Sequence, residues 1–176
     1  MTPEQRPLTA SINAMESGVY ALADMLGMRA VDAILFRLLV MLTPEMQNAF
    51  EREIRQHGLN EIEFRTLAIL FRHDDGRASP SELCSFDTIS RANMTRISDV
   101  LVARKLITRA AASNDRRRIV LAITAKGRRL VRTVAPRLMP GLDALLSGVG
   151  AREKKQLIDT LKRIAGNLDA WNRSPP

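Results

Sequence analysis

The sequence has few of the residues on which disulfide, metal and redox chemistry depend. Its 176 residues include one Cys, two His and only 4% aromatic residues. A single Cys excludes an internal disulfide, and His57, His73 and Cys84, with no recurring short spacing, make a poor ligand set for a metal. We therefore expect no metal and no cofactor, and the scarcity of aromatic residues predicts an aliphatic core.

Long hydrophobic runs are also missing. The most apolar stretch, residues 30–42, is interrupted by Asp32 and Arg37 and is too short to cross a bilayer. The N-terminus has no apolar segment behind a basic head, so we expect a cytoplasmic protein. The sequence has no nucleophile elbow, no glycine-rich phosphate loop and no zinc-protease helix, and we expect no enzyme.

Positive charge, by contrast, is abundant and segregated. The net charge is +8, and residues 86–132 alone hold twelve Lys or Arg and three acidic residues, a net of +9. The remainder has fifteen basic and sixteen acidic residues, a net of −1. A solvated basic surface is the simple alternative, but such complete segregation favours a polyanionic partner, because clustered cations displace condensed counterions from nucleic acid.

Helical periodicity covers the first part of the chain. Apolar residues recur at helical spacing over residues 10–27 and again over residues 31–42. Thr43 and Pro44 then leave two alternatives, since a new helix could begin there or one helix could continue with a kink. In either case the pattern predicts helix up to about Gly58.

The middle of the chain predicts a helix-turn-helix. A helix is expected over residues 60–72, followed by a turn. The segment Ser79–Glu82 has a capping Ser, a Pro at the first helical position and a Glu three residues after the cap, which is a helix start with a capping box. Ser90 caps a second short helix that runs to about Lys105, so two helices meet at a tight turn.

A β-hairpin and a long helix follow. Residues 107–113 and 118–124 are short strands, the second with strand-like alternation, and the polar residues 114–117 form the hairpin tip between them. Thr124 caps a helix over about residues 125–146. The order predicts a mainly α fold: a winged helix-turn-helix with a two-stranded β-hairpin wing, flanked by N- and C-terminal dimerisation helices.

The helix that follows Ser90 has two different faces. One face is apolar and is expected to point inward; it comprises Met94, Ile97 and Leu101, and Ser98 lies next to it. The other face lies near the helix start, where a recognition helix contacts the major groove through Arg and Thr side chains. We assign DNA binding to Ser90, Arg91, Ala92, Asn93, Thr95 and Arg96; the alternative is an ordinary solvent-facing surface.

Asp99 lies near the same face and would repel phosphate. We predict that it pairs with a nearby Arg, for example one from the wing, and holds that Arg in place. Asp115 is expected to form the turn of the wing. Cys84 is predicted to be a buried, inert thiol in preference to a redox sensor.

These stretches together resemble the MarR (multiple antibiotic resistance regulator) family of winged helix-turn-helix regulators. The matching parts lie in order between Leu67 and Leu130. They are Ser81–Cys84, Ser90–Leu101, Lys105–Arg109, the wing Asn114–Arg117 and the strand exit Leu121–Gly127. The resemblance implies that Arg116 and Arg117 reach toward the minor groove.

The resemblance also implies a homodimer formed by the terminal helices. The last helix, residues 151–171, has an apolar stripe at helical spacing, and both ends of the chain carry more apolar surface than one winged helix can cover. We assign dimerisation to Leu157, Leu161, Ile164, Leu168 and Trp171. The predicted division is residues 1–58 (dimerisation), 59–124 (DNA-binding lobe) and 125–176 (dimerisation).

The predicted function is sequence-specific binding of double-stranded DNA. By resemblance, the protein is a repressor that binds a pseudo-palindromic operator and is released by a small effector, in this family often an aromatic or phenolic acid. The alternative is a winged-helix architectural or RNA-associated protein without sequence preference.

Overall fold

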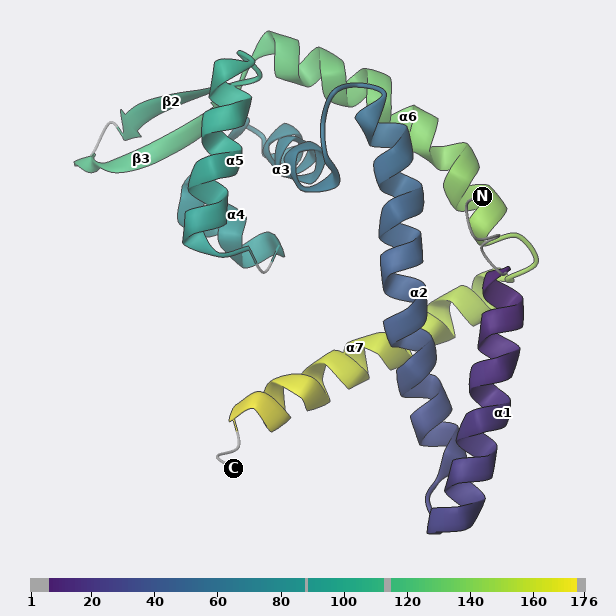
Figure 1. Cartoon of the computed structure of the whole chain (residues 1–176). Coiled ribbons are helices and arrows are strands. Elements are labelled where there is room, and N and C mark those ends of the chain that lie inside the picture. The colour runs from purple at the N-terminus through teal and green to yellow at the C-terminus, as the bar shows by residue number, and fades with distance from the viewer. Residues whose placement is uncertain (1–6, 88, 113–114, 174–176) are drawn as a thin grey trace, which may run out of the picture. The chain divides into compact units, whose positions relative to one another are not determined.

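The computed structural model describes residues 7–87, 89–112 and 115–173. The chain forms two compact units, residues 1–134 and residues 135–176. The first unit contains a helical hairpin and the lobe with the three-stranded sheet, and the second contains the end of one long helix and the last helix (Figure 1). The functional division predicted from the sequence stays a prediction.

The helical hairpin consists of α1 (Leu8–Leu26) and α2 (Ala30–Arg55). Gly27 ends α1 in the left-handed region, with φ of 65°, and its N–H donates to the carbonyl of Ala23. α2 continues through Pro44, so of the two alternatives the structure has a single helix of 26 residues with the Pro inside it.

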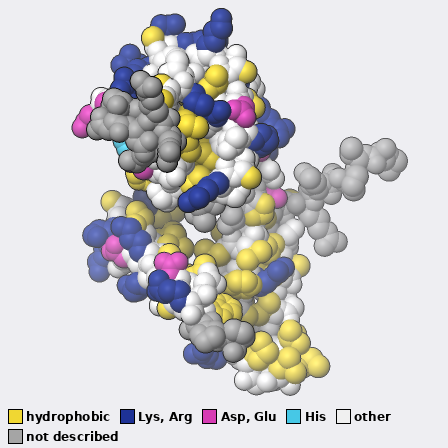
Figure 2. Space-filling model, turned by 90° about the vertical axis from the view of Figure 1, so that its left-hand side faces the viewer, with side chains coloured by type: hydrophobic (Ala, Val, Ile, Leu, Met, Phe, Trp, Pro, Cys, Tyr) yellow, Lys and Arg dark blue, Asp and Glu magenta, His cyan; other side chains and the backbone are white. Residues whose placement is uncertain are grey.

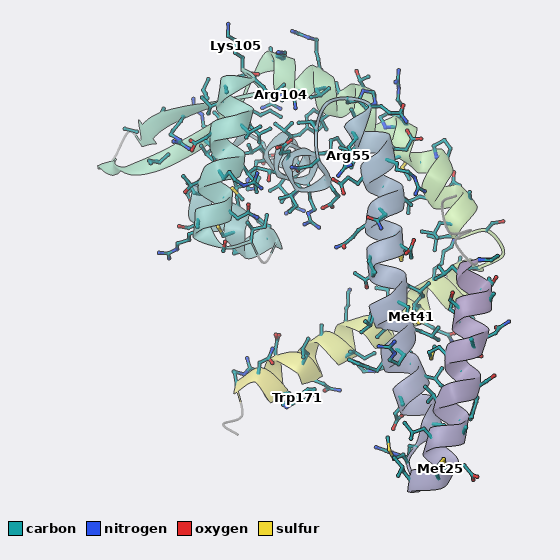
Figure 3. The ribbon with its side chains drawn as sticks, in the orientation of Figure 1. Met25, Met41, Arg55, Arg104, Lys105 and Trp171 are labelled. Atoms are coloured by element: carbon teal, nitrogen blue, oxygen red, sulfur yellow. The ribbon has the colours of Figure 1, made fainter. Side chains whose placement is uncertain are left out.

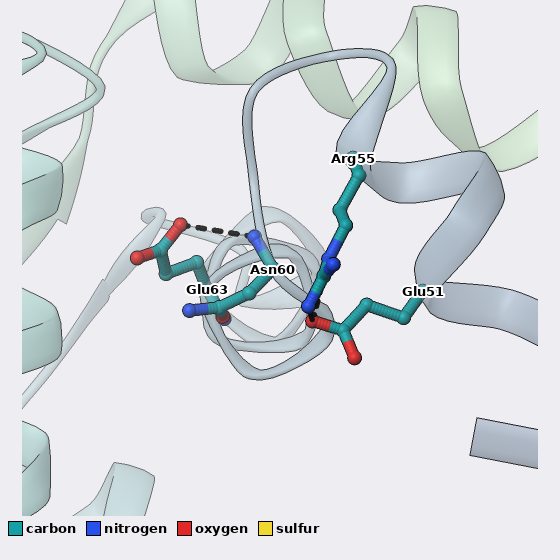
Figure 4. Close-up of polar contacts among 4 residues, drawn as sticks. All are labelled: Glu51, Arg55, Asn60 and Glu63. Atoms are coloured by element: carbon teal, nitrogen blue, oxygen red, sulfur yellow. Dashed lines mark hydrogen bonds and ion pairs between the residues drawn. The ribbon is translucent and has the colours of Figure 1, made fainter. Parts of the chain in front are cut away.

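Helix α3 (Glu61–Arg72) begins with a capping box (Figure 4). The Asn60 side-chain oxygen accepts from the Glu63 N–H at 2.8 Å, and the Glu63 carboxylate accepts from the Asn60 N–H at 3.1 Å. Nearby, Arg55 and Glu51 form an ion pair at 2.9 Å across the last turn of α2. These contacts fix both ends of the short α2–α3 connection.

The helix-turn-helix is formed by α4 (Pro80–Asp87) and α5 (Arg91–Ala103), as the sequence predicts. The capping box before α4 is confirmed: the Ser79 N–H donates to the Glu82 carboxylate at 2.6 Å, and the Glu82 N–H donates to Ser79 Oγ at 3.2 Å. The core beneath is aliphatic, as predicted. Its fully buried members include Leu67, Leu70, Leu83, Leu101, Leu106 and Leu121.

The sheet has three antiparallel strands in the order β1-β3-β2, where β1 is Arg77–Ala78, β2 is Ile107–Ala112 and β3 is Asp115–Ile123. The structure differs from the sequence-based expectation in two places. β1 is not predicted from the sequence, because two residues are too few to show alternation. The second strand of the hairpin begins at Asp115 and not at residue 118, because Asp115 already pairs with Ala112.

Helix α6 (Ala125–Leu145) starts where the sequence predicts. Thr124 Oγ1 accepts from the Gly127 N–H at 3.0 Å, which confirms the predicted cap. In the second unit, α7 (Ala151–Arg173) begins with the Glu153 carboxylate accepting from the Gly150 N–H at 2.7 Å. No helix among the described residues is long and apolar enough to span a membrane.

Candidate nucleic-acid interface

The start of α5 is fixed by its predicted cap. Ser90 has an extended backbone, and its hydroxyl oxygen accepts from the Asn93 N–H at 3.3 Å. This bond satisfies one of the four N–H groups that a helix start leaves without an intrahelical partner. The remaining N–H groups and the positive end of the helix dipole form a surface that favours anions.

The two predicted faces of α5 are confirmed by burial. Met94, Ile97 and Leu101 are almost completely buried, and so is Ser98, whose hydroxyl donates to the Met94 carbonyl at 2.7 Å. The opposite face is exposed and includes Arg91, Ala92, Thr95 and Arg96. The apolar face therefore packs against the core. The exposed polar and cationic face, which we call the front of α5, points toward solvent.

Contacts within the front of α5 orient its side chains. Arg96 Nη2 donates to the Asn93 side-chain oxygen at 3.2 Å, and Thr95 Oγ1 donates to the Arg91 carbonyl at 3.1 Å. Asn93 is half-buried, so it supports Arg96 and does not itself stand on the outermost surface. The six residues assigned to DNA binding thus lie together on the first turns of one helix.

Asp99 forms the ion pair that the sequence predicts. Its partner is Arg109 of β2, with 2.9 Å between Asp99 Oδ1 and Arg109 Nη2. The Arg109 side chain is 36% exposed and the Asp99 side chain 60%, so the pair is accessible to solvent and contributes about 0–1 kcal/mol to stability. Its main structural effect is to connect the recognition helix to the base of the wing.

The wing is a hairpin of β2 and β3 with Ile107 opposite Ile123 and a register irregularity at Ala111–Ala112. Three residues assigned to the wing, Asp115, Arg116 and Arg117, belong to β3. This corrects the prediction that they form the hairpin tip. Their side chains lie outside the described residues, so the predicted groove contact of the two Arg residues stays a prediction.

Basic side chains are exposed at both ends of α5. Arg91 and Arg96 lie near its start, whereas Lys105, Lys126 and Arg129 lie beyond its end or on α6. Figure 2 views the molecule from the side on which the β2–β3 hairpin lies in Figure 1 and shows Lys and Arg side chains over the upper part of the surface. Of the basic residues in 86–132 whose side chains the structure describes, most are therefore exposed.

Cys84 is half-buried, not buried as predicted. The fully buried position on α4 belongs to its neighbour Leu83, because an eight-residue helix turns only one narrow side toward the core. His73 packs edge-on against Phe86, with ring centroids 5.8 Å apart. Among the described residues, no group of His, Cys, Asp and Glu could hold a metal ion.

Large apolar side chains are exposed on the terminal helices. The structure describes every residue of α7, and none of them is buried; of the five assigned to dimerisation, Ile164 is half-buried and the others are exposed, Trp171 by 76%. On the α1–α2 hairpin, Met25 at the end of α1 is 80% exposed (Figure 3). Exposed apolar patches are a common feature of interaction surfaces.

Comparisons with known proteins agree with this geometry. The model of the MarR family matches residues 59–119. The transcriptional repressor MprA of Escherichia coli K12 is 32% identical over 138 residues, which cover 78% of this chain and 78% of that protein.

The fold is also that of solved regulators. A MarR family transcriptional regulator from Streptomyces coelicolor, Sco3205, in complex with DNA, superposes with a TM-score of 0.75 at 17% identity and covers 80% of this chain and 89% of that one. BpsR of Bordetella bronchiseptica, solved in a study of how 6-hydroxynicotinic acid regulates its DNA binding, gives a TM-score of 0.66 at 23% identity, covering 73% and 91%.

Proposed function

The chain belongs to the MarR family of transcription regulators, and from this premise we propose that it is a ligand-responsive repressor that binds a pseudo-palindromic operator as a homodimer. That it is a transcription regulator and not an enzyme follows from the family itself. The repressor role is supported by the relative MprA, a transcriptional repressor. As a DNA-binding regulator it acts in the cytoplasm.

The observation that supports operator binding most directly is the contrast between the two faces of α5. Met94 and Ile97 are buried on one face, and Arg91 and Arg96 are exposed on the other. Inserted into the major groove, Arg96 reads a guanine edge through two parallel hydrogen bonds, and Thr95 contacts a phosphate or a thymine methyl. Ser90 contacts a phosphate at the helix start.

The wing extends this contact along the duplex. Arg116 and Arg117 enter the adjacent minor groove, where negative potential attracts guanidinium groups. The Asp99–Arg109 pair holds the base of the wing at a fixed distance from α5. In a dimer, the two recognition helices meet half-sites about one helical turn apart, and this spacing requires a pseudo-palindrome.

The homodimer is supported by the exposed apolar surface of the terminal helices. Trp171 and Leu168 on α7, and Val31 and Phe36 on α2, are each at least half exposed. A stable dimer buries about 1,200–2,000 Å² in total, and this requires large apolar side chains of the kind found here. Sedimentation as a monomer at micromolar concentration would contradict the proposal.

The experiment for operator binding is fluorescence anisotropy of the protein on the DNA upstream of its own gene and on scrambled DNA, across a salt series. We expect binding to the upstream DNA to be tighter by about 1,000-fold or more, with a steep salt slope from released counterions. Equal binding to both DNAs would favour the architectural alternative.

Two variants make the test specific to the front of α5. Arg96→Ala should weaken operator binding by about 1–3 kcal/mol, or about 5–150-fold, because a bidentate base contact is lost. Arg137→Ala removes the same charge from an exposed position on α6 outside residues 86–132 and should leave operator binding within about twofold of the wild type. Equal losses in the two variants would show that only overall charge matters.

For the effector we propose a small aromatic or phenolic acid. The support is that BpsR, which has this fold, responds to 6-hydroxynicotinic acid, an aromatic acid with a hydroxyl group. Salicylate and 6-hydroxynicotinate are suitable probes in the same anisotropy assay. Release of the operator complex by either acid, with acetate inactive at equal concentration, would support the proposal, and no release by any aromatic acid would contradict it.

A further inference from the structure

Arg104 occupies the end of the recognition helix. It is the C-terminal cap of α5, and its own N–H donates to the Val100 carbonyl at 3.1 Å. Its side chain is half-buried and leaves the helix toward the connection between α2 and α3. Figure 3 shows Arg104 at this end of α5, beside the more exposed Lys105.

The guanidinium of Arg104 binds the backbone directly after α2. Nη1 donates to the Gly58 carbonyl, and Nη2 donates to the His57 carbonyl at 3.2 Å. These partners are 46 and 47 residues away in the sequence. Both carbonyls follow the C-terminal end of α2, where the helix dipole favours a cation.

The backbone that accepts these bonds is held firmly. Ile54 and Leu59, on either side of it, are 1% and 2% exposed, and the Gly58 N–H donates to the Arg55 carbonyl at 2.8 Å. Gly58 has φ of 69°, and a Cβ there would lie 3.2 Å from Arg104 Nη2. The guanidinium therefore lies directly against a segment that moves together with the end of α2.

A third element is tied to the same residue. Lys126, in the first turn of α6, donates from Nζ to the Arg104 carbonyl at 2.9 Å. Arg104 thus contacts the end of α2 through its side chain, α5 through its N–H and the start of α6 through its carbonyl. In chemical terms, a planar guanidinium with two parallel donors resists both sliding and rotation, whereas a Lys ammonium at this position would act from a single point.

We propose that Arg104 is a positioning residue that sets the place of the recognition helix relative to α2 and thereby the half-site spacing that the protein accepts. This inference depends on the proposed function, since α2 contributes to the dimer surface through exposed residues such as Leu35 and Phe36. If α2 is held in the dimer interface, the distance between the two recognition helices is constant only when each α5 keeps its position relative to the α2 of its own protomer. Arg104 contributes to this coupling by binding the backbone after α2 directly from the end of α5.

The experiment measures spacing preference. The operator is first obtained by selection from random-sequence duplexes, and derivatives are made with one or two base pairs inserted or removed between the half-sites. Each base pair moves one half-site by about 3.4 Å and rotates it by about 34–36°. The wild type should lose about tenfold or more in affinity for each altered operator, since even one mismatched base pair costs a comparable factor.

In Arg104→Ala the end of α5 loses its hydrogen bonds to the backbone after α2. The variant should therefore lose less than about threefold on the altered operators, while its affinity for scrambled DNA stays within about twofold of the wild type. Arg104→Lys should be intermediate. Arg137→Ala, the charge-matched control on α6, should keep the full wild-type preference. A purely structural role would lower affinity for all DNAs in parallel and leave the preference unchanged.

Thermal melting followed by circular dichroism shows whether each variant is folded. If Arg104→Ala does not fold, Arg104→Lys and Gly58→Ala test the same contact from its two sides, and both should reduce the spacing preference. Unchanged preference in the folded variants would overturn the inference while leaving the proposed function intact. A wild type that selects no paired half-sites would instead overturn the proposed function.

Discussion

Replacing Gly127 by alanine tests how closely the first turn of α6 packs against the end of the helix-turn-helix. A Cβ at Gly127 would lie 2.3 Å from the Leu106 carbonyl oxygen and 2.8 Å from Ile123 Cγ1. Ordinary contact begins at 3.4 Å, so the two backbone segments would have to separate by about 1.1 Å. The nearer obstacle is the Leu106 backbone oxygen, which cannot rotate away, and the Ile123 side chain beside it is buried and has little room to move.

The cost follows from what that separation breaks. Leu106 O accepts from the Thr124 N–H at 3.0 Å and from Thr124 Oγ1 at 3.0 Å, and Thr124 Oγ1 in turn caps α6. Overpacking costs about 1–3 kcal/mol, and each weakened hydrogen bond about 1 kcal/mol. The higher helix propensity of Ala returns about 1 kcal/mol. The free energy of unfolding should therefore fall by about 2–4 kcal/mol.

The assay is thermal unfolding followed by circular dichroism, with Gly141→Ala as the matched control in the same helix. For a chain of this length, a loss of 2–4 kcal/mol lowers Tm by about 5–15 °C. Nothing lies within 4 Å of a Cβ at Gly141, so the control should gain about 0.5–1 kcal/mol and melt slightly higher. Equal Tm values for Gly127→Ala and the wild type, or equal losses in both variants, would refute the packing argument.

Three further predictions concern single side chains. Ser90→Ala should lower the free energy of unfolding by about 1 kcal/mol, measured by urea denaturation, because the Asn93 N–H loses its acceptor. Asp99→Asn should weaken operator binding in the anisotropy assay but change stability by less than about 1 kcal/mol, because the exposed pair with Arg109 positions the wing more than it stabilises the fold; unchanged or tighter DNA binding would contradict this role. Trp171→Lys should shift the sedimentation of the protein toward the monomer, since its 76% exposed indole then becomes a charge in the proposed interface, and an unchanged dimer would place the interface elsewhere.

Local chemistry in the sequence was enough to predict where most helices begin. The caps at Ser79, Ser90 and Thr124 accept from N–H groups only three residues later in the chain. They can therefore be predicted from the local sequence alone. The two faces of α5 follow from the same short-range periodicity, because positions three and four apart share one side of a helix. Pro44 shows the limit of local patterns, since the sequence left open whether a new helix starts there, and the structure has a continuous α2.

The sequence by itself determined the family, the helix-turn-helix, the cationic front of α5 and the need of Asp99 for an Arg. Only the tertiary structure decided which Arg that is, that Arg77–Ala78 completes the sheet, and that Arg104 reaches backbone 46 and 47 residues away. The physical reason is range. Caps and periodicity act within one or two turns, whereas a long-range partner depends on how folding brings distant segments together, and nothing in the residues near Arg104 specifies a carbonyl at the end of α2.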